Sequence, residues 1–330
     1  YIIKFMVSDG QLKDEENVTI TVNNVNRPPI LDPIGNFTIN ESQLLQFNFR
    51  VSDPDGDIPL HTFIAPLPQG ASITVGEGDI LIFTWRPDFG QNGTYIVTFI
   101  VSDGQLTDNE NVTIIVNPVQ TFSDVPRDYW AWKQIETFYQ LNITKGCSDQ
   151  DGNPNTLEFC PANPVSRDQM AVFLVRALGE EETVWPYDPV DPKTWSVNFS
   201  DVPPGYWAWY HIQRFFELGI TKGCADQDGN PETKEFCPTQ NVTRDQMAVF
   251  LVRAFGEEGP PWPYDPADDS TWAIDFSDVP SDYWAWYHIQ KFFELGITQG
   301  CTATEFCPTQ NVLRDQMAVF IVRAVNKGLL

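Results

Sequence analysis

Apolar and polar residues follow different patterns in the two parts of the chain. Between Leu31 and Val119, short runs rich in β-branched and aromatic residues, such as LLQFNFRV, DILIFTW and TYIVTFIV, are separated by Gly, Pro, Asn and Asp. Runs of this kind between turn-forming residues are typical of β-strands. We therefore predict an all-β sandwich over residues 27–119.

The first residues repeat the end of this sandwich. YIIKFMVSDGQLKDEENVTITV at residues 1–22 returns as YIVTFIVSDGQLTDNENVTIIV at residues 95–116. This repeat fits tandem immunoglobulin-like domains, with residues 1–26 supplying only the last two strands of the preceding one. Two strands cannot bury a core alone. We expect the remaining strands to come from upstream chain, which makes this the C-terminal part of a longer protein, or from another subunit.

Beyond the sandwich the apolar residues take a helical spacing, and the pattern is written three times. FSDVPRDYWAW, FSDVPPGYWAW and FSDVPSDYWAW open the repeats, and RDQMAVFLVRA or RDQMAVFIVRA closes them. In the second repeat Trp209, Ile212 and Phe215 share one face of a first helix. Gly219, or Asn142 in repeat 1, follows this helix and tolerates the left-handed backbone of a C-cap. Each repeat is therefore predicted to be a module of two helices.

The residue before the second helix differs among the repeats. Ser166 or Thr243 precedes it in repeats 1 and 2, with Gln three residues later, which predicts a capping box. In repeat 3 the same position is Leu313, which cannot accept a hydrogen bond from the helix. We therefore expect Arg314, the next residue, to be held less rigidly than its equivalents.

Charge excludes one class of partner. Asp and Glu outnumber Lys and Arg by 45 to 20, which gives a net charge of −25. Such a chain repels phosphate backbones and anionic lipid, so we expect no nucleic-acid partner. No run of about 18 apolar residues is present, and we expect no membrane span. Eight N-x-S/T sequons fit a glycosylated surface protein, or chance in a chain rich in Asn and Thr.

The cysteines occur as one pair in each repeat. Six cysteines allow 15 pairings, but the repeat selects the one that stays within each module. Paired structural cysteines indicate an oxidising, extracytoplasmic location. The predicted disulfides join Cys147 to Cys160, Cys224 to Cys237 and Cys301 to Cys307.

The three repeats resemble the S-layer homology (SLH) module. The resemblance rests on the F-x-D-V start, a helix ending in G-I-T-x-G, an F-x-P turn and a T-R-A-E-like helix start, here SRDQ, TRDQ or LRDQ. It implies an all-α bundle of three modules with a pseudo-threefold arrangement, which holds a protein on a prokaryotic cell surface by binding anionic wall polysaccharide. Gln replaces the usual Glu of the last motif, so the identity of the ligand stays open.

These patterns divide the chain into seven segments. The two linkers between modules are acidic, Pro-rich and Trp-bearing, and we expect them to be ordered arms whose Trp185 and Trp262 dock on the helices. The predicted segments are residues 1–26 (strands of a preceding domain), 27–119 (sandwich), 120–178, 196–255 and 273–330 (modules 1 to 3), and 179–195 and 256–272 (linkers).

An arginine opens the second helix of every module. The N–H groups and the dipole of a helix N-terminus favour an anion there, and a guanidinium adds a bidentate grip on a carboxylate. The SLH resemblance adds the Asp of F-x-D-V and a nearby Trp. The alternative is an Arg–Asp salt bridge between modules, with the tryptophans in the core. The candidate wall-polymer residues are Arg167, Arg244, Arg314, Asp124, Asp201, Asp278, Trp130, Trp207 and Trp284.

Acidic motifs in both parts of the chain suggest calcium. The sandwich resembles cadherin-like repeats, on VNNVNRPP at the junction and on the acids of SDPDGD and VSDGQ, and in cadherins such oxygens bind calcium between domains. DPDGD also fits a simple turn. DQDGN in repeats 1 and 2 resembles the front of a calcium loop, or a surface turn closed by a disulfide. The candidate ligands are Glu41, Asp53, Asp55, Asp57, Asp103, Asp149, Asp151, Asp226 and Asp228.

Catalytic signals are weak. One repeat has Gln134 where the others have His211 and His288, so these histidines are improbable general bases. No G-x-S-x-G, H-E-x-x-H or phosphate-loop motif is present. We predict a non-catalytic, extracellular surface protein of the S-layer type. Two hypotheses remain: a stalk attached through wall polysaccharide, or a protomer that contacts other copies of itself in a lattice or filament and is a homo-oligomer.

Overall fold

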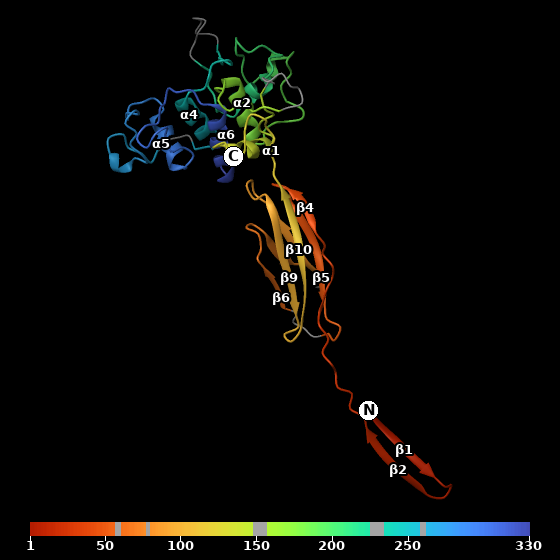
Figure 1. The fold of residues 1–330 in the computed structure, drawn as a ribbon. Helices are drawn as coiled ribbons and strands as arrows, with labels where there is room; N and C mark the ends of the chain where they lie inside the picture. Colours follow the sequence, from red (N-terminus) through yellow and green to blue (C-terminus); the bar gives the residue numbers. More distant parts are fainter. Residues whose placement is uncertain (57–60, 77–79, 148–156, 225–233, 258–261) are drawn as a thin grey trace. The chain divides into compact units, whose positions relative to one another are not determined.

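The computed structural model divides into two compact units, Tyr1–Val119 and Gln120–Leu330 (Figure 1). No helix in the part of the chain that the structure describes combines the length and apolar character needed to cross a bilayer. Asp57, Asp149, Asp151, Asp226 and Asp228, all candidate calcium ligands, lie outside the described residues. The structure describes residues 1–56, 61–76, 80–147, 157–224, 234–257 and 262–330.

The first unit begins with an isolated hairpin. Strands β1 (Ile2–Ser8) and β2 (Lys13–Thr19) pair antiparallel, with Ser8 opposite Lys13. Every residue of both strands is exposed, including Phe5, which is 57% exposed. The hairpin has strand-forming sequence but no packing partner among the described residues.

The rest of the first unit is a sandwich of two four-stranded sheets. One sheet has the order β4-β10-β9-β6, in which only β10 and β4 are parallel, and the other has the order β3-β5-β8-β7, which is antiparallel throughout. The strands are β3 (Ile30–Leu31), β4 (Phe37–Asn40), β5 (Leu45–Ser52), β6 (His61–Ala65), β7 (Ser72–Val75), β8 (Ile80–Trp85), β9 (Gly93–Ser102) and β10 (Thr107–Asn117).

Alternate residues of the facing strands fill the core of the sandwich. Val97, Phe99 and Val101 of β9 are fully buried, as are Phe83 and Trp85 of β8. This alternation is the one that a sheet with one solvated face requires. The predicted immunoglobulin-like sandwich is confirmed. Residues 3, 5 and 7 of the hairpin repeat the buried positions of β9 in the sequence, yet they lie exposed.

Each module of the second unit contributes two α-helices to the described structure. Asn142 and Gly219 follow the first helices of modules 1 and 2 with φ of 58° and 73°, as predicted for C-caps. The α-helices are α1 (Trp132–Gln140) and α2 (Arg167–Ala177) in module 1, α3 (Trp209–Glu217) and α4 (Arg244–Ala254) in module 2, and α5 (Trp286–Glu294) and α6 (Arg314–Asn326) in module 3. The short 3₁₀ helices η1 (Pro192–Thr194) and η2 (Asp269–Thr271) lie in the two linkers.

The modules contact one another in a cycle. Helix α2 packs on α3, α4 on α5, and α6 returns to α1. Just before the second helices, three buried valines join the modules by backbone hydrogen bonds: Val165 N–H donates to the carbonyl of Val312, Val312 N–H to that of Val242, and Val242 N–H to that of Val165, at 2.8 to 2.9 Å. We call these three residues the valine ring. It satisfies buried backbone groups by joining segments up to 147 residues apart in the sequence (312 − 165).

The starts of the second helices differ from the prediction. Ser166 and Thr243 occupy the N-cap positions of α2 and α4, but neither side chain accepts a hydrogen bond from its helix. Each hydroxyl instead donates to the aspartate two residues later, Asp168 or Asp245. The same carboxylate oxygen accepts the following backbone N–H at 2.7 Å. The predicted capping boxes are wrong, because a carboxylate in the first turn is a stronger acceptor than a hydroxyl.

The predicted disulfides are confirmed. Cys147 bonds to Cys160, Cys224 to Cys237, and Cys301 to Cys307, so each bond stays within one module. The second cysteine of every pair has φ of 56° to 57°, a backbone conformation that favours glycine and is held here by the covalent link and by the neighbouring hydrogen bonds.

Candidate ligand-binding grooves between the modules

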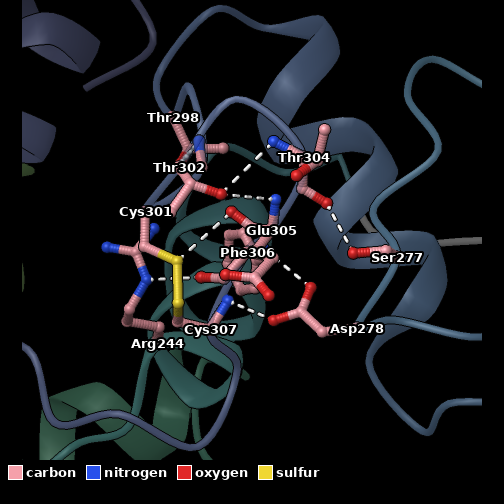
Figure 2. Close-up of a disulfide and its surroundings, with 11 residues drawn as sticks. Arg244, Ser277, Asp278, Thr298, Cys301, Thr302, Thr304, Glu305, Phe306 and Cys307 are labelled. Carbon is pink, nitrogen blue, oxygen red and sulfur yellow. Dashed lines mark hydrogen bonds between the residues drawn. A yellow bond between two sulfur atoms is a disulfide. The ribbon is translucent and has the colours of Figure 1, made fainter.

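The aspartate of F-x-D-V fixes the cysteine turn of its own module. Figure 2 shows Asp278 with its two oxygens accepting the backbone N–H groups of Phe306 and Cys307, at 2.8 and 2.7 Å. Asp124 and Asp201 bind the equivalent turns of modules 1 and 2. The sequence predicts that these carboxylates contact the ligand. In the structure both oxygens of each carboxylate instead accept hydrogen bonds from backbone N–H groups.

The arginine that opens each second helix is buried against a different module. Arg167, Arg244 and Arg314 are each 4% exposed. The Nε–H of each donates at 2.7 Å to a phenylalanine carbonyl of the next module in the cycle, Phe236, Phe306 or Phe159. Burial lowers the pKa of each guanidinium to about 10, and the F-x-D-V aspartate opposes this shift. The positive charges therefore lie at the seams between modules, where they bind carbonyl groups.

Arg314 is not the least constrained of the three, contrary to the sequence prediction. Its Nη2 donates to the carbonyl of Gly146 at 3.1 Å, and its Nη1 to Gln169 Oε1 at 3.4 Å. The weaker attachment belongs to Arg244, whose Nη2 is buried and has no hydrogen-bond partner within the described residues. The missing cap at Leu313 has little effect because Asp315 accepts the N–H of Gln316 at 2.6 Å.

An aspartate beside each arginine holds the exposed tryptophan of the next module. The Oδ2 of Asp168 accepts from Tyr206 Oη at 2.6 Å and from Trp207 Nε1 at 3.0 Å. Asp245 and Asp315 bind the same pair of side chains in modules 3 and 1. Burial, and then the bond to Asp168, raise the pKa of Tyr206 to about 12. The indole is thus fixed at one edge while its ring faces solvent.

Trp130, Trp207 and Trp284 are 61, 59 and 60% exposed, which excludes the alternative that they belong to the core. The other part of that alternative was an Arg–Asp salt bridge between modules. The hydrogen bonds described for Arg167 go to the carbonyls of Phe236 and Gly223, so the aspartate acts on it only at longer range.

Three equivalent grooves lie at the seams between modules in the described part of the chain. Each takes a wall from one module, a tryptophan from the next and an arginine from the previous one. Their volumes are about 360, 370 and 350 Å³, in the range of sites for small ligands. The defining residues are Lys145, Cys147, Gln169, Arg176, Trp207 and Arg314 for groove 1; Lys222, Cys224, Gln246, Arg253, Trp284 and Arg167 for groove 2; and Gln299, Cys301, Gln316, Arg323, Trp130 and Arg244 for groove 3.

The charge of the grooves is opposite to that of the chain. The described residues that line them include lysine and arginine but no aspartate or glutamate. Lys145 and Lys222 are exposed on the walls of grooves 1 and 2, and Gln299 takes this place in groove 3. In groove 1 the helix arginine Arg176 also pairs with Glu181, 3.1 Å away on the linker. Within a chain of net charge −25, these are local basic surfaces.

The arginines and tryptophans that the sequence marked as candidates line the same grooves, but sequence reasoning missed other lining residues. Lys145 and Lys222 occupy the variable position of G-I-T-x-G, or N-I-T-x-G in module 1, and the repeat alone could have marked them. The role of Asp168 was also missed, because its partners, Tyr206 and Trp207, are 38 and 39 residues away in the sequence.

The linker tryptophans dock as predicted. Trp185 stacks on Tyr210 of α3 with ring centroids 5.8 Å apart, and Trp262 stacks on Tyr287 of α5 at 5.6 Å. Tyr187, which follows Trp185, is buried and donates its hydroxyl to Glu217. The described residues of both linkers are therefore part of the folded unit.

The described calcium candidates of the sandwich are engaged in hydrogen bonds. Glu41 accepts three backbone N–H groups, and Asp103 accepts two backbone N–H groups and the amide of Asn26. Both oxygens of Asp55 accept from Arg27. Within the described residues, no group of three carboxylate, cysteine or histidine ligands that converge within 4.8 Å includes these acids. In this arrangement they are occupied by hydrogen bonds, and calcium, which needs six to eight converging oxygens, stays a prediction for this junction.

The chain matches two known protein families. Residues 26–115 match the bacterial Ig domain, and residues 121–171, 198–248 and 275–318 match the S-layer homology domain. The matched segments cover most of each module and most of the sandwich.

Longer proteins with surface or glycosidase names are similar to this chain. An S-layer protein of Bacillus thuringiensis subsp. finitimus is 28% identical over 63% of the chain, and a cell surface protein of Thermoanaerobacter kivui is 32% identical over 43%. An endoglucanase of Bacillus sp. (strain KSM-635) is 29% identical over 61%. The chain spans 22, 16 and 18% of these three proteins, in that order.

Proposed function

Since the chain carries a bacterial Ig domain followed by three S-layer homology domains and has a place at the prokaryotic cell surface, we propose that its modules anchor an Ig-like stalk by binding anionic wall polysaccharide. Cell-surface anchoring follows from the family and from the named surface relatives. The proposal adds the ligand and its site, which are the three grooves. It also assigns the chain a structural role, separate from the glycosidase activity in the names of some longer relatives.

The proposal treats the three modules as one pseudo-threefold bundle. Support comes from the valine ring, in which every module donates a backbone hydrogen bond to one neighbour and accepts one from the other. The cycle of helix contacts gives the same arrangement. In such a unit none of these three grooves is complete within a single module, because the tryptophan and the arginine of each come from different neighbours.

The observation that carries the proposal is the basic lining of grooves on an acidic chain. An anionic sugar is repelled by most of the surface and attracted to the grooves, where local positive charge outweighs the net charge at short range. The fixed tryptophan beside each groove offers an apolar ring face to a sugar, and Gln169, Gln246 and Gln316 offer amide groups to its hydroxyls.

Substituting the exposed lysines tests ligand binding in the grooves more clearly than substituting the buried arginines. Arg167→Ala would remove hydrogen bonds that join two modules, so a loss of binding could follow from misfolding. Lys145 and Lys222 are exposed. We expect Lys145→Gln and Lys222→Gln each to weaken binding of the full chain to isolated wall polysaccharide about fivefold, a typical value for one exposed ionic contact of about 1 kcal/mol.

Gln299→Lys is the matched control, because it places the same cation in groove 3. It is expected to strengthen binding by a similar factor, and raised salt should reduce the effect of all three variants. Polysaccharide stripped of its anionic groups should bind weakly to every form. Unchanged binding in the double variant Lys145→Gln/Lys222→Gln would reject groove binding.

The β1–β2 hairpin is the candidate contact for a second function, self-assembly, in which another copy of the chain and not upstream chain supplies the strands that cover it. Ile2, Phe5, Met6 and Val7 are 57 to 72% exposed on one short hairpin, and apolar groups gathered in this way mark interaction sites. If the hairpin joins copies of this chain, removing residues 1–19 should abolish oligomers in sedimentation and electron microscopy without changing polysaccharide binding. Equal oligomerisation of both forms would exclude the hairpin as the contact.

A further inference from the structure

We call residues 20–29, between β2 and β3, the hairpin linker. Two of its residues, Asn26 and Arg27, are hydrogen-bonded to turns of the sandwich. Asn26 donates its amide to Asp103 Oδ2 at 2.9 Å, in the turn between β9 and β10. Arg27 binds Asp55, in the turn after β5. Both turns contain the acids that the cadherin-like pattern assigns to calcium.

The contact between Arg27 and Asp55 uses backbone and side chain together. The Arg27 backbone N–H donates to Asp55 Oδ2 at 2.7 Å, while its Nε and Nη2 donate to Oδ1 at 3.0 and 2.8 Å. Nη2 also donates to the carbonyl of Pro54 at 2.5 Å. The Asp55 side chain is 4% exposed, whereas that of Arg27 is 58% exposed. The guanidinium thus covers the carboxylate from the solvent side.

The charges around this contact are those of a cation site. Asp53 acts electrostatically on Arg27, and Asp103 acts on Asp55, so two further carboxylates lie near the Arg27–Asp55 pair. Asp53 Oδ1 accepts the N–H of Asp55 at 2.7 Å, which holds the turn in place. The bond from Arg27 keeps the pKa of Asp55 below its usual value, as a bound cation would.

We propose that Arg27 supplies the positive charge that a calcium ion supplies at a cadherin-like junction, so that this linker is fixed to the sandwich without metal. A guanidinium can do this because its fork of N–H groups matches the two acceptors, Asp55 Oδ1 and the Pro54 carbonyl, and it remains charged at any physiological pH. The order of the linker then does not depend on the calcium concentration outside the cell. The inference is independent of the proposed sugar grooves.

Hydrogen exchange of the full chain, read on a peptide that spans residues 24–32, tests the proposal locally. Calcium bound elsewhere in the chain does not affect this readout. We expect the same protection in excess calcium and in excess chelator. Arg27→Ala should speed exchange in this peptide about fivefold, the effect of losing one partly exposed ionic contact. Arg27→Lys keeps the charge but loses the fork of N–H groups, so its exchange rate in this peptide should lie between those of the wild type and Arg27→Ala.

Lys4→Ala is the matched control, because it breaks another exposed ion pair, with Glu15 on the hairpin, and should leave the peptide unchanged. Faster exchange of the wild-type peptide in chelator would overturn the proposal, since the metal would then be fixing the linker. Normal protection in Arg27→Ala would overturn it as well.

Discussion

Removing the carboxylate of Asp168 is expected to loosen the seam between modules 1 and 2. Asp168 is 5% exposed, and its Oδ2 accepts from Tyr206 and Trp207 of the neighbouring module. Its Oδ1 accepts from Ser166 and from the backbone N–H of Gln169. Asp168→Ala removes all four bonds and leaves the tyrosine hydroxyl without its acceptor.

Hydrogen bonds to a charged group contribute about 1.5–3 kcal/mol each. The exposed indole regains water in the variant, so we expect Asp168→Ala to cost about 4 kcal/mol in total, or about 10 °C in the melting temperature of a unit of this size. In Asp168→Asn the amide oxygen can still accept from the two aromatic side chains, but its NH₂ faces the Gln169 N–H. We expect about half the loss.

Calorimetry of the full chain measures both shifts on the transition of the second unit. Asp282→Asn, at an exposed aspartate of module 3, is the control and should change nothing. A double-mutant cycle of Asp168→Asn with Tyr206→Phe should show a coupling of about 1 kcal/mol. A melting temperature for Asp168→Ala that matches the wild type would refute the argument, because a buried four-bond acceptor would then contribute nothing to the seam.

Two further predictions concern pH and the disulfides. Tyr206 has a pKa of about 12 in the folded chain, against an ordinary value of 10.0 for a solvated tyrosine. The stability that it contributes is therefore complete below pH 10 and is lost as the pH rises toward 12. An ultraviolet titration should show this late ionisation, and Asp168→Asn should move it to lower pH. Replacing Cys147 and Cys160 by Ala should lower the free energy of unfolding in denaturant by about 3 kcal/mol. Replacing Cys301 and Cys307 should cost about 0.6 kcal/mol less, because the closed loop is shorter (separation 6 against 13). Equal losses would contradict the loop-entropy explanation.

The sequence was sufficient where a residue acts within its own repeat. The disulfides follow from the period, and the docking of Trp185 follows from the need to cover a large apolar ring. Likewise Asn142 and Gly219 end their helices for a backbone reason that is local.

Prediction failed where the partner belongs to another module. Arg314 donates to the carbonyl of Phe159, 155 residues away, and no local pattern shows that its charge is used there. Ser166 has the sequence of a cap, yet Asp168 competes for its hydroxyl while also binding module 2. The lysines of grooves 1 and 2 were overlooked because an exposed lysine beside a glycine usually has no specific role.

The valine ring has a consequence for copy number. In an open repeat array, units can be added or lost at small cost, because each one contacts only its neighbours in sequence. Here the bond between Val165 and Val312 closes the series, so the loss of one repeat would leave buried N–H and carbonyl groups without partners, and a fourth repeat would find no unpaired group of the ring to join. Recombination between such similar repeats would readily change their number in the gene. Ring closure therefore makes three the number of modules that satisfies every backbone group of the valine ring with none left over.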